Sequence, residues 1–277
     1  MRMAIVNGLP PDRSADLYDA IAYEVRARGV DAVVVHGRGA AESAVHGCDL
    51  VFSNCVLPLA AAGGTRIYAG AALPRPASLR LLEEAGVPTM QWALAASRRE
   101  VRALFERWRV EHVLLKPSFT FGGRQVRVVR RHALWRLRWH REVDIFCREV
   151  NPEDGDVYKA ELLAGRVLIA WKSESPPIRA RRRQGILRGL AGAYGERRLW
   201  DPPHDLASTL TAFSSRLAAR GIGHVSVDLM RRPDGAMAAI ELNLSRVATW
   251  WTRQFPRFRE QYAAALCDLA TGATAPP

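Results

Sequence analysis

Residues 224–245 read HVSVDLMRRPDGAMAAIELNLS, two runs rich in apolar residues on either side of the turn sequence Pro-Asp-Gly. This pattern predicts a β-hairpin. Side chains two residues apart leave the same face of a strand, so Glu241 and Asn243 share a face, and cross-strand pairing can bring Asp228 opposite them. Three oxygen donors, two of them anionic, suit Mg²⁺ that also holds phosphate oxygens. The alternative for the short ELN sequence alone is a solvated strand face.

A second hairpin is predicted where HVLLKPS and RQVRVVRR flank the sequence FTFGG. Gly122 and Gly123 at its tip have no side chain, so their backbone N–H groups can approach a phosphate closely. Lys116, just before the tip, adds a cation. An ordinary flexible hairpin tip is the competing interpretation of a Gly-Gly pair, and the nearby lysine favours the phosphate site.

Lysine is rare in this chain: Lys116, Lys159 and Lys172 are the only ones among 40 basic residues, and the other 37 are arginine. An ammonium group is a compact point donor that the forked guanidinium does not replace at every site, so each lysine is a candidate phosphate contact. The formal net charge of +12 over 277 residues favours anionic partners. Nucleic acids, phosphorylated metabolites and polycarboxylates all meet that description.

The order of the predicted elements indicates an α/β protein, and the length and apolar content suit one large or two to three small domains. A β-α-β pattern opens the chain, without the GxGxxG sequence of dinucleotide sites. Residues 176–200 are basic and glycine-rich, which suggests a mobile or irregular segment over a cleft. Strands are expected at 3–6, 31–37, 49–55, 88–94, 112–118, 124–131 and 143–150, hairpins at 156–174 and 224–245, and helices at 14–28, 77–85, 98–109, 206–220 and 255–269.

The motifs between Arg75 and Ser245 resemble, in their order, the ATP-grasp superfamily, and most closely its RimK-like amino-acid ligase branch. The parts are the lysine strand LLKPS, the glycine-rich loop FTFGG, the linker CREV, the hairpin DVYKAELLAGRV and the metal hairpin VDLM with IELN. The resemblance implies an N-terminal α/β domain (1–73) and two α+β subdomains that clasp the nucleotide, a small lid (74–147) and a C-terminal part with the metal site (148–277).

The resemblance also implies ATP and Mg²⁺ as cofactors and a role for each matching residue. The implied phosphate contacts are Arg75, Lys116, Gly122, Gly123, Lys159 and Lys172; the adenine contacts are the Glu149 and Val150 backbone; the metal ligands are Asp228, Glu241 and Asn243; and Arg183 or Arg188 would stabilise the transferring phosphoryl group. All three lysines would then point into one ATP site.

The chain departs from the family pattern at three places. Arg75 stands where the family has a lysine, and Tyr158 followed by Lys159 stands where these ligases usually have an aspartate followed two residues later by an arginine. After ELN the chain reads LSRVATWW instead of a Pro-Gly turn. Arg246 or the Trp250-Trp251 pair is therefore expected to shape an unusual acceptor pocket.

The resemblance implies a ligase that activates a carboxylate as an acyl phosphate, which an amine attacks to give an amide, ADP and phosphate. The basic segments favour an acidic partner, such as glutamate added to a peptide or cofactor. One alternative is an ATP-grasp kinase acting on a polyanionic small molecule. A second is nucleic-acid binding through Trp135, Trp139 and nearby arginines. Against it, tryptophans four apart share a helix face and more often pack into a core.

The cysteines, the apolar runs and the histidines give further expectations about location and chemistry. The four cysteines show no CxxC pair, which favours reduced thiols and a cytoplasmic protein. No apolar run is long enough for a signal peptide or a membrane span. The sequence leaves open whether the protein forms a homo-oligomer. His112 and His224 begin predicted strands and are expected to be structural, whereas His204 is expected in a loop. The absence of GxSxG gives no support to a hydrolase.

Overall fold

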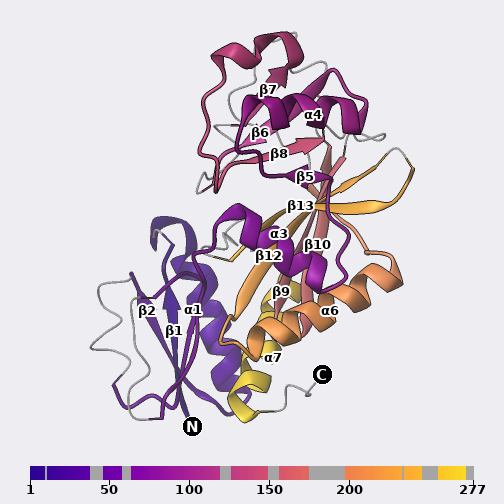
Figure 1. Cartoon of the computed structure of the whole chain (residues 1–277). Helices are drawn as coiled ribbons and strands as arrows, with labels where there is room; N and C mark the ends of the chain where they lie inside the picture. The colour runs from indigo at the N-terminus through magenta and orange to yellow at the C-terminus, as the bar shows by residue number, and fades with distance from the viewer. Residues whose placement is uncertain are drawn as a thin grey trace.

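Over the residues that it describes, the computed structural model contains three β-sheets flanked by helices, which confirms the predicted α/β class. Figure 1 shows the sheet of residues 156–243 between the other two. Among the described helices, none is long and apolar enough to cross a membrane. The domain boundaries at 73/74 and 147/148 stay predictions. The structure describes residues 1–9, 11–37, 46–57, 64–118, 126–148, 156–174, 197–232, 234–244 and 255–272.

The first sheet consists of β1 (Arg2–Asn7), β2 (Asp31–His36), β3 (Leu50–Ser53) and β4 (Arg66–Tyr68), all parallel, in the order β2-β1-β3-β4. Strand β1 is buried along almost its whole length, as expected for a parallel strand with both faces covered. Helix α1 (Pro11–Ala27) packs against this sheet, so the predicted β-α-β opening is confirmed. The sequence pattern did not predict β4, because three half-exposed residues show no apolar periodicity.

The second sheet consists of β5 (Trp92–Ala93), β6 (His112–Lys116), β7 (Arg127–Arg130) and β8 (Ile145–Arg148), antiparallel, in the order β5-β8-β6-β7. Helix α4 (Arg98–Trp108) belongs to the same core, because it buries Val101, Leu104, Phe105 and Trp108 against the sheet. The strand predicted at 88–94 is shorter than expected. Its first residues pair instead with the edge of the third sheet, where the Met90 N–H donates to the Ala239 carbonyl at 3.0 Å.

The two tryptophans beside the second sheet do not share a helix face, so that prediction is wrong. The short 3-10 helix η1 (Arg131–Arg136) ends before Trp139. Trp139 packs edge-on against Phe146, whereas Trp135 is 65% exposed. The expected core packing therefore holds for Trp139 alone.

The third sheet consists of β9 (Asp156–Leu163), β10 (Arg166–Glu174), β11 (Arg197–Leu199), β12 (His224–Arg231) and β13 (Met237–Asn243), in the order β11-β10-β9-β12-β13. The predicted turn at Ala164-Gly165 is confirmed by positive φ angles of 49° and 79°. Strand β11 lies in the stretch predicted to be irregular. The sequence pattern did not predict it, because a short, charged edge strand has no apolar run. Residues 176–196 of that stretch lie outside the described residues.

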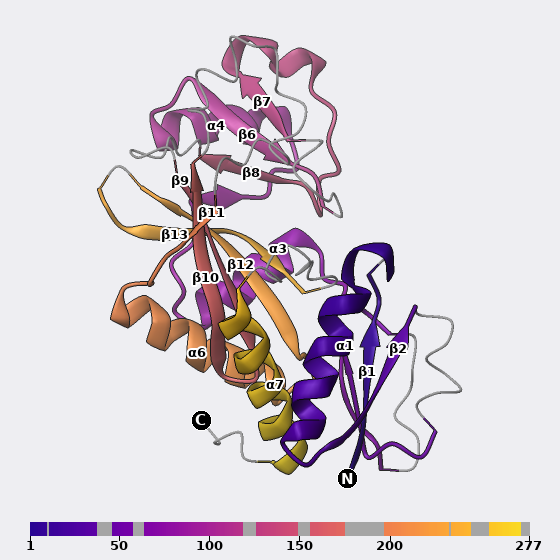
Figure 2. The ribbon, with the colours of Figure 1, turned by 180° about the vertical axis from the view of Figure 1, so that it is seen from behind.

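Two helices pack against the third sheet, and a third joins it to the first. Helix α3 (Arg75–Glu84) lies against β13, and α6 (His204–Ala218) lies against β9 and β10. His204 begins α6 and does not lie in a loop, contrary to expectation. Helix α7 (Pro256–Thr271) lies between the third sheet and α1, as Figure 2 shows from behind. One apolar core therefore spans the first sheet, α1, α7 and the near end of β9–β10.

This core encloses three polar side chains, which we call the interface cluster: Glu161, His224 and Tyr262. All three are at most 1% exposed. The Tyr262 hydroxyl lies 3.0 Å from His224 Nδ1, and His224 Nε2 lies 3.4 Å from Glu161 Oε2. Burial raises the pKa of Tyr262 well above its ordinary value, so the phenol stays protonated. The expectation that His224 is structural agrees with this burial.

Candidate functional site

The metal hairpin predicted from the sequence is formed by β12 and β13, and its three oxygen-bearing side chains lie together. Asp228 pairs directly with Glu241 across the hairpin. The Asn243 amide nitrogen donates to Asp228 Oδ2 at 3.0 Å. Strand pairing on the other side places Lys159 of β9 opposite Asp228. Side-chain alternation in strands thus puts all four groups on one face of the third sheet.

Each carboxylate of this hairpin is paired with a cation. Lys159 Nζ lies 2.7 Å from Asp228 Oδ1, and Arg75 Nη1, at the start of α3, lies 3.2 Å from Glu241 Oε2. The Asp228 and Glu241 side chains keep 16% and 27% of their surface exposed. We call these residues, with Asn243, the paired-charge cluster. Because water and ligands reach its carboxylates, the pairs can be exchanged for a metal ion on the acids and phosphate oxygens on the cations.

Lys116 reaches this cluster from the second sheet. It is the last residue of β6 and only 7% exposed, and its Nζ donates to the Ile240 carbonyl at 3.3 Å. Ile240 is the extra residue of a β-bulge, because Asp228 pairs with Glu241 while Leu229 pairs with Ala239. Bulges often re-aim side chains next to functional sites. Here the bulge turns a carbonyl towards the lysine and joins the two sheets.

Burial changes the protonation balance of Lys116. Loss of hydration lowers its pKa, and Arg75 acts in the same direction. Cys147, Glu241 and Asp228 oppose that shift through their charges. An arriving phosphate would add negative charge and favour the protonated ammonium. The position is therefore suited to a cation that an anionic ligand would stabilise further.

Asp144, which no sequence motif singled out, supports the end of β6. Asp144 is 3% exposed, and its carboxylate accepts N–H bonds from Ser118 at 3.2 Å and His140 at 2.8 Å. The Ser118 hydroxyl donates to the Val143 carbonyl and accepts the Arg75 N–H at 3.3 Å. Two side chains thus fix the backbone between Lys116 and the predicted glycine loop. An acidic residue at the start of an apolar strand was the available signal.

Lys172 does not join the cluster, so the prediction that all three lysines share one site is wrong. Lys159 pairs with Trp171, whereas Lys172 pairs with Tyr158. Because successive side chains leave opposite faces of a strand, this one-residue offset puts the two lysines on opposite faces. The Lys172 ammonium binds Asp156 Oδ2 at 2.9 Å on that other face.

Several predicted site residues lie outside the described residues, and their roles stay predictions. They are Gly122, Gly123, Glu149, Val150, Arg183, Arg188, Arg246, Trp250 and Trp251.

The residues present fit a magnesium ion. Over the described ranges, no three His, Cys, Asp or Glu side chains gather as a metal-binding group. An ion here would use two carboxylates and the Asn243 amide oxygen, and would complete its shell with water and ligand oxygens. Mg²⁺ is commonly bound in this way, by one or two carboxylates together with phosphates. Neither thiolate nor imidazole is among these donors, so a softer metal is not favoured.

Comparisons with known proteins identify the fold. No family model matches the chain, and no curated protein matches its sequence. Solved structures match over nearly their whole length: D-cycloserine synthetase DcsG at 16% identity and TM-score 0.64, covering 97% of this chain and 99% of that one. Macrocyclase MdnC of Microcystis aeruginosa MRC, bound with precursor peptide MdnA, matches at 10% and 0.65, covering 98% and 100%. A RimK domain ATP-grasp protein of Sphaerobacter thermophilus DSM 20745 matches at 15% and 0.59, covering 96% and 99%. This protein has the ATP-grasp fold.

Proposed function

We propose that this protein is an ATP-dependent carboxylate–amine ligase. The observation that carries the proposal is the meeting of Lys116 from the second sheet with the paired-charge cluster of the third. Cations from two sheets surround two carboxylates that can accept a divalent ion. The ligases among the solved structures with this fold support the same reaction class.

Each described residue has a role in this proposal. Lys116 contacts the phosphates of ATP, while Arg75 and Lys159 exchange their carboxylate partners for phosphate oxygens. Asp228, Glu241 and Asn243 hold magnesium, which neutralises charge on the transferring phosphoryl group when bound. Because a phosphoryl transfer requires little covalent chemistry from the protein, positioning and charge neutralisation supply most of the rate enhancement.

The reaction proceeds in two balanced steps. A carboxylate oxygen of the first substrate attacks the γ-phosphorus of ATP, and the bond to ADP breaks. The amine nitrogen of the second substrate then attacks the acyl carbon, phosphate leaves with its bonding electrons, and the amine proton passes to solvent or a base. The cations around the carboxylate pair stabilise the negative charge that moves from the γ-phosphate to ADP and then to phosphate.

We propose an acidic substrate for this reaction, either glutamate or an acidic peptide. The support is the net charge of +12. Solved structures of similar fold include the ligase PsnB and the macrocyclase MdnC, each in complex with a precursor peptide. A peptide or amino-acid substrate is therefore favoured over a neutral metabolite.

The test measures ADP and free phosphate released from Mg-ATP across a panel of amines and acidic acceptors, with the product mass determined in parallel. A ligase releases both in equal amounts, only when amine and carboxylate are present, and forms a product that has lost one water. Formation of ADP with a phosphorylated product and no free phosphate would instead establish a kinase.

A further inference from the structure

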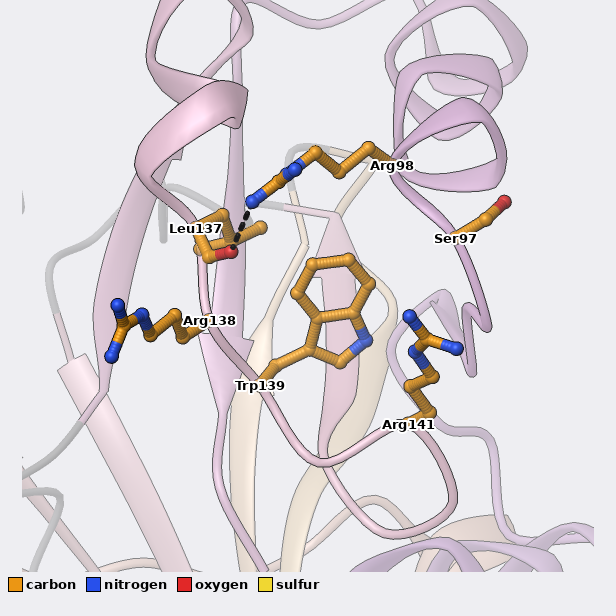
Figure 3. A pocket seen from close by; sticks show the side chains of 6 residues that line it. All are labelled: Ser97, Arg98, Leu137, Arg138, Trp139 and Arg141. Atoms are coloured by element: carbon orange, nitrogen blue, oxygen red, sulfur yellow. Dashed lines mark hydrogen bonds between the residues drawn. The ribbon is translucent and has the colours of Figure 1, made fainter.

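A cationic pocket lies beside the second sheet and shares no residue with the paired-charge cluster. It opens between the start of α4 and the segment that follows η1 (Figure 3). Its volume is about 380 Å³. That volume falls in the range of ordinary small-ligand pockets and accommodates one or two side chains. The lining residues are Ser97, Arg98, Leu137, Arg138, Trp139 and Arg141.

The three arginines of the pocket are exposed and available to an anion. Figure 3 shows the indole of Trp139 between Arg98 and Arg141. Arg98 donates to the Leu137 carbonyl at 3.4 Å, which leaves most of its five N–H donors unused. Within the part of the chain that the structure describes, no carboxylate pairs with Arg98, Arg138 or Arg141. This contrasts with Arg75, whose guanidinium is neutralised by Glu241.

The start of α4 already carries its own acceptors, the Ser97 hydroxyl and the Glu100 carboxylate. Ser97 accepts the Glu100 N–H at 3.2 Å, and the Glu100 carboxylate accepts the Ala96 N–H at 3.0 Å. These two bonds use one N–H of the first turn, that of Glu100, and the Ala96 N–H just before the helix. Recognition in the pocket therefore depends on the guanidinium groups.

The aromatic wall of the pocket is fixed in place. Trp139 Nε1 donates to the Ala95 carbonyl at 2.7 Å, and the indole meets Phe146 edge-on, with ring centroids 5.7 Å apart. Leu137 is 9% exposed and adds an apolar surface. Because these groups are held without a ligand, binding loses little side-chain entropy. The pocket thus offers a preformed apolar wall for the stem of a side chain and forked donors for its charged end.

We propose that this pocket binds the carboxylate side chains of an acidic peptide segment. Guanidinium groups pair with planar carboxylates through two parallel hydrogen bonds, and the wall beside them suits the aliphatic stem of glutamate. A nucleic-acid strand is less well matched, because stacking needs free aromatic faces. The Trp139 ring packs against Phe146, and the Arg136 guanidinium lies over one face of the exposed Trp135 ring, 4.2 Å from its centroid.

The binding claim stands on the pocket alone, and only its use as a docking point for the ligase substrate rests on the proposed function. Since the pocket and the paired-charge cluster have no residue in common, a peptide held here engages the protein through a part that does not react. Such remote contacts can select a substrate and position its reacting end.

The test is a direct binding titration without nucleotide, using a fluorescently labelled oligo-glutamate peptide and fluorescence anisotropy. Arg98→Gln/Arg141→Gln removes two pocket cations and should weaken binding about ten-fold or more, since charge-assisted hydrogen bonds are lost. The control Arg102→Gln/Arg107→Gln removes two exposed cations from α4, the helix that carries Arg98, but none from the pocket. It should weaken binding less than about two-fold, through the general field alone.

Four further outcomes decide the proposal. Equal losses in the two double variants would overturn it in favour of diffuse surface charge, and equally tight binding of an oligo-glutamine peptide would overturn the carboxylate assignment. Tighter binding of oligo-dT that depends on Arg98 and Arg141 would overturn the peptide assignment in favour of nucleic acid. Glu241→Gln should bind the peptide as wild type does even though it should lose ATP turnover. Loss of ligase activity is thereby distinguished from loss of peptide binding at the pocket.

Discussion

The paired-charge cluster and the interface cluster lie on the same face of the same sheet, yet they differ in what surrounds them. Glu161 of β9 pairs in register with Ser226 of β12, and Ser226 pairs with Asn243 of β13, so these three residues lie on one face of the sheet. Both clusters join a carboxylate to a basic side chain. The Asp228 and Glu241 side chains keep 16% and 27% of their surface exposed, whereas that of Glu161 keeps none. Helix α7 and the first sheet cover only the interface cluster.

This difference separates exchangeable charge pairs from a buried structural contact. A carboxylate in contact with water can release its cation and bind a metal, because solvent and ligand replace the lost partner. A buried carboxylate has no such replacement, and loss of its partner leaves an uncompensated charge. Each cluster has a carboxylate on the same face of the sheet, so the covering helix contributes to the choice between binding and stability.

The largest expected effect comes from breaking the paired-charge cluster. Glu241→Gln removes an anionic metal ligand and should lower ATP turnover by on the order of 10³-fold, with little change in thermal stability, because the side chain is partly exposed. Turnover at saturating Mg-ATP and the unfolding temperature are measured together. The control is Asp234→Asn in the turn of the same hairpin, which changes an exposed carboxylate in the same way. Wild-type turnover in Glu241→Gln would remove the metal assignment.

Breaking the interface cluster should instead reduce stability. His224→Phe leaves Glu161 buried without its basic partner and should lower the free energy of unfolding by about 3 kcal/mol, while turnover per folded molecule stays unchanged. Urea unfolding gives the first quantity and active-site titration the second. The double variant Glu161→Leu/His224→Phe should recover most of the loss. A single-variant cost below about 1 kcal/mol would show that the pair does not stabilise this interface.

A smaller effect separates two lysines that the sequence placed in one site. Lys116→Arg should weaken nucleotide binding about ten-fold, because a longer, forked guanidinium does not fit the space of the buried ammonium. Lys172→Arg should leave binding within about two-fold of wild type, since this lysine is on the opposite face and 41% exposed. Isothermal titration with a non-hydrolysable ATP analogue measures both. Equal weakening in the two variants would contradict the assignment of faces.

The smallest effect is a pH dependence of stability. The pKa of Lys116 is lowered in the folded protein, so above that pKa the unfolded chain binds more protons than the folded one. The contribution of Lys116 to stability therefore rises as the pH increases from its folded pKa towards its unfolded pKa of about 10.4. The rise is at most about 1.4 kcal/mol per pH unit.

The measurement compares urea unfolding of wild type and Lys116→Met between neutral and alkaline pH without nucleotide. The stability difference between the two proteins reports Lys116 together with its coupling to the buried thiol of Cys147, whose pKa burial raises and the Lys116 charge lowers. The wild type should gain stability relative to the variant as the pH rises. A difference that stays constant with pH would show that Lys116 titrates normally.

The sequence by itself determined most elements and the composition of the metal hairpin. Apolar periodicity located the helices and long strands, because burial of one face requires apolar residues at fixed spacing. The spacing of Glu241 and Asn243 gave their common face without any structure. Elements below about four residues, such as β4 and β11, were missed because so short a run carries no periodicity.

Tertiary structure alone decided which charges meet. Pairing register placed Lys159 beside Asp228 and sent Lys172 to the other face, and a one-residue shift would have reversed the result. The packing of α3 on β13 brought Arg75 to Glu241 from 166 positions away in the chain. The cover of α7 made Glu161 and His224 structural. Local sequence encodes conformation and alternation, whereas contacts between distant segments depend on register and on the layer that covers each face.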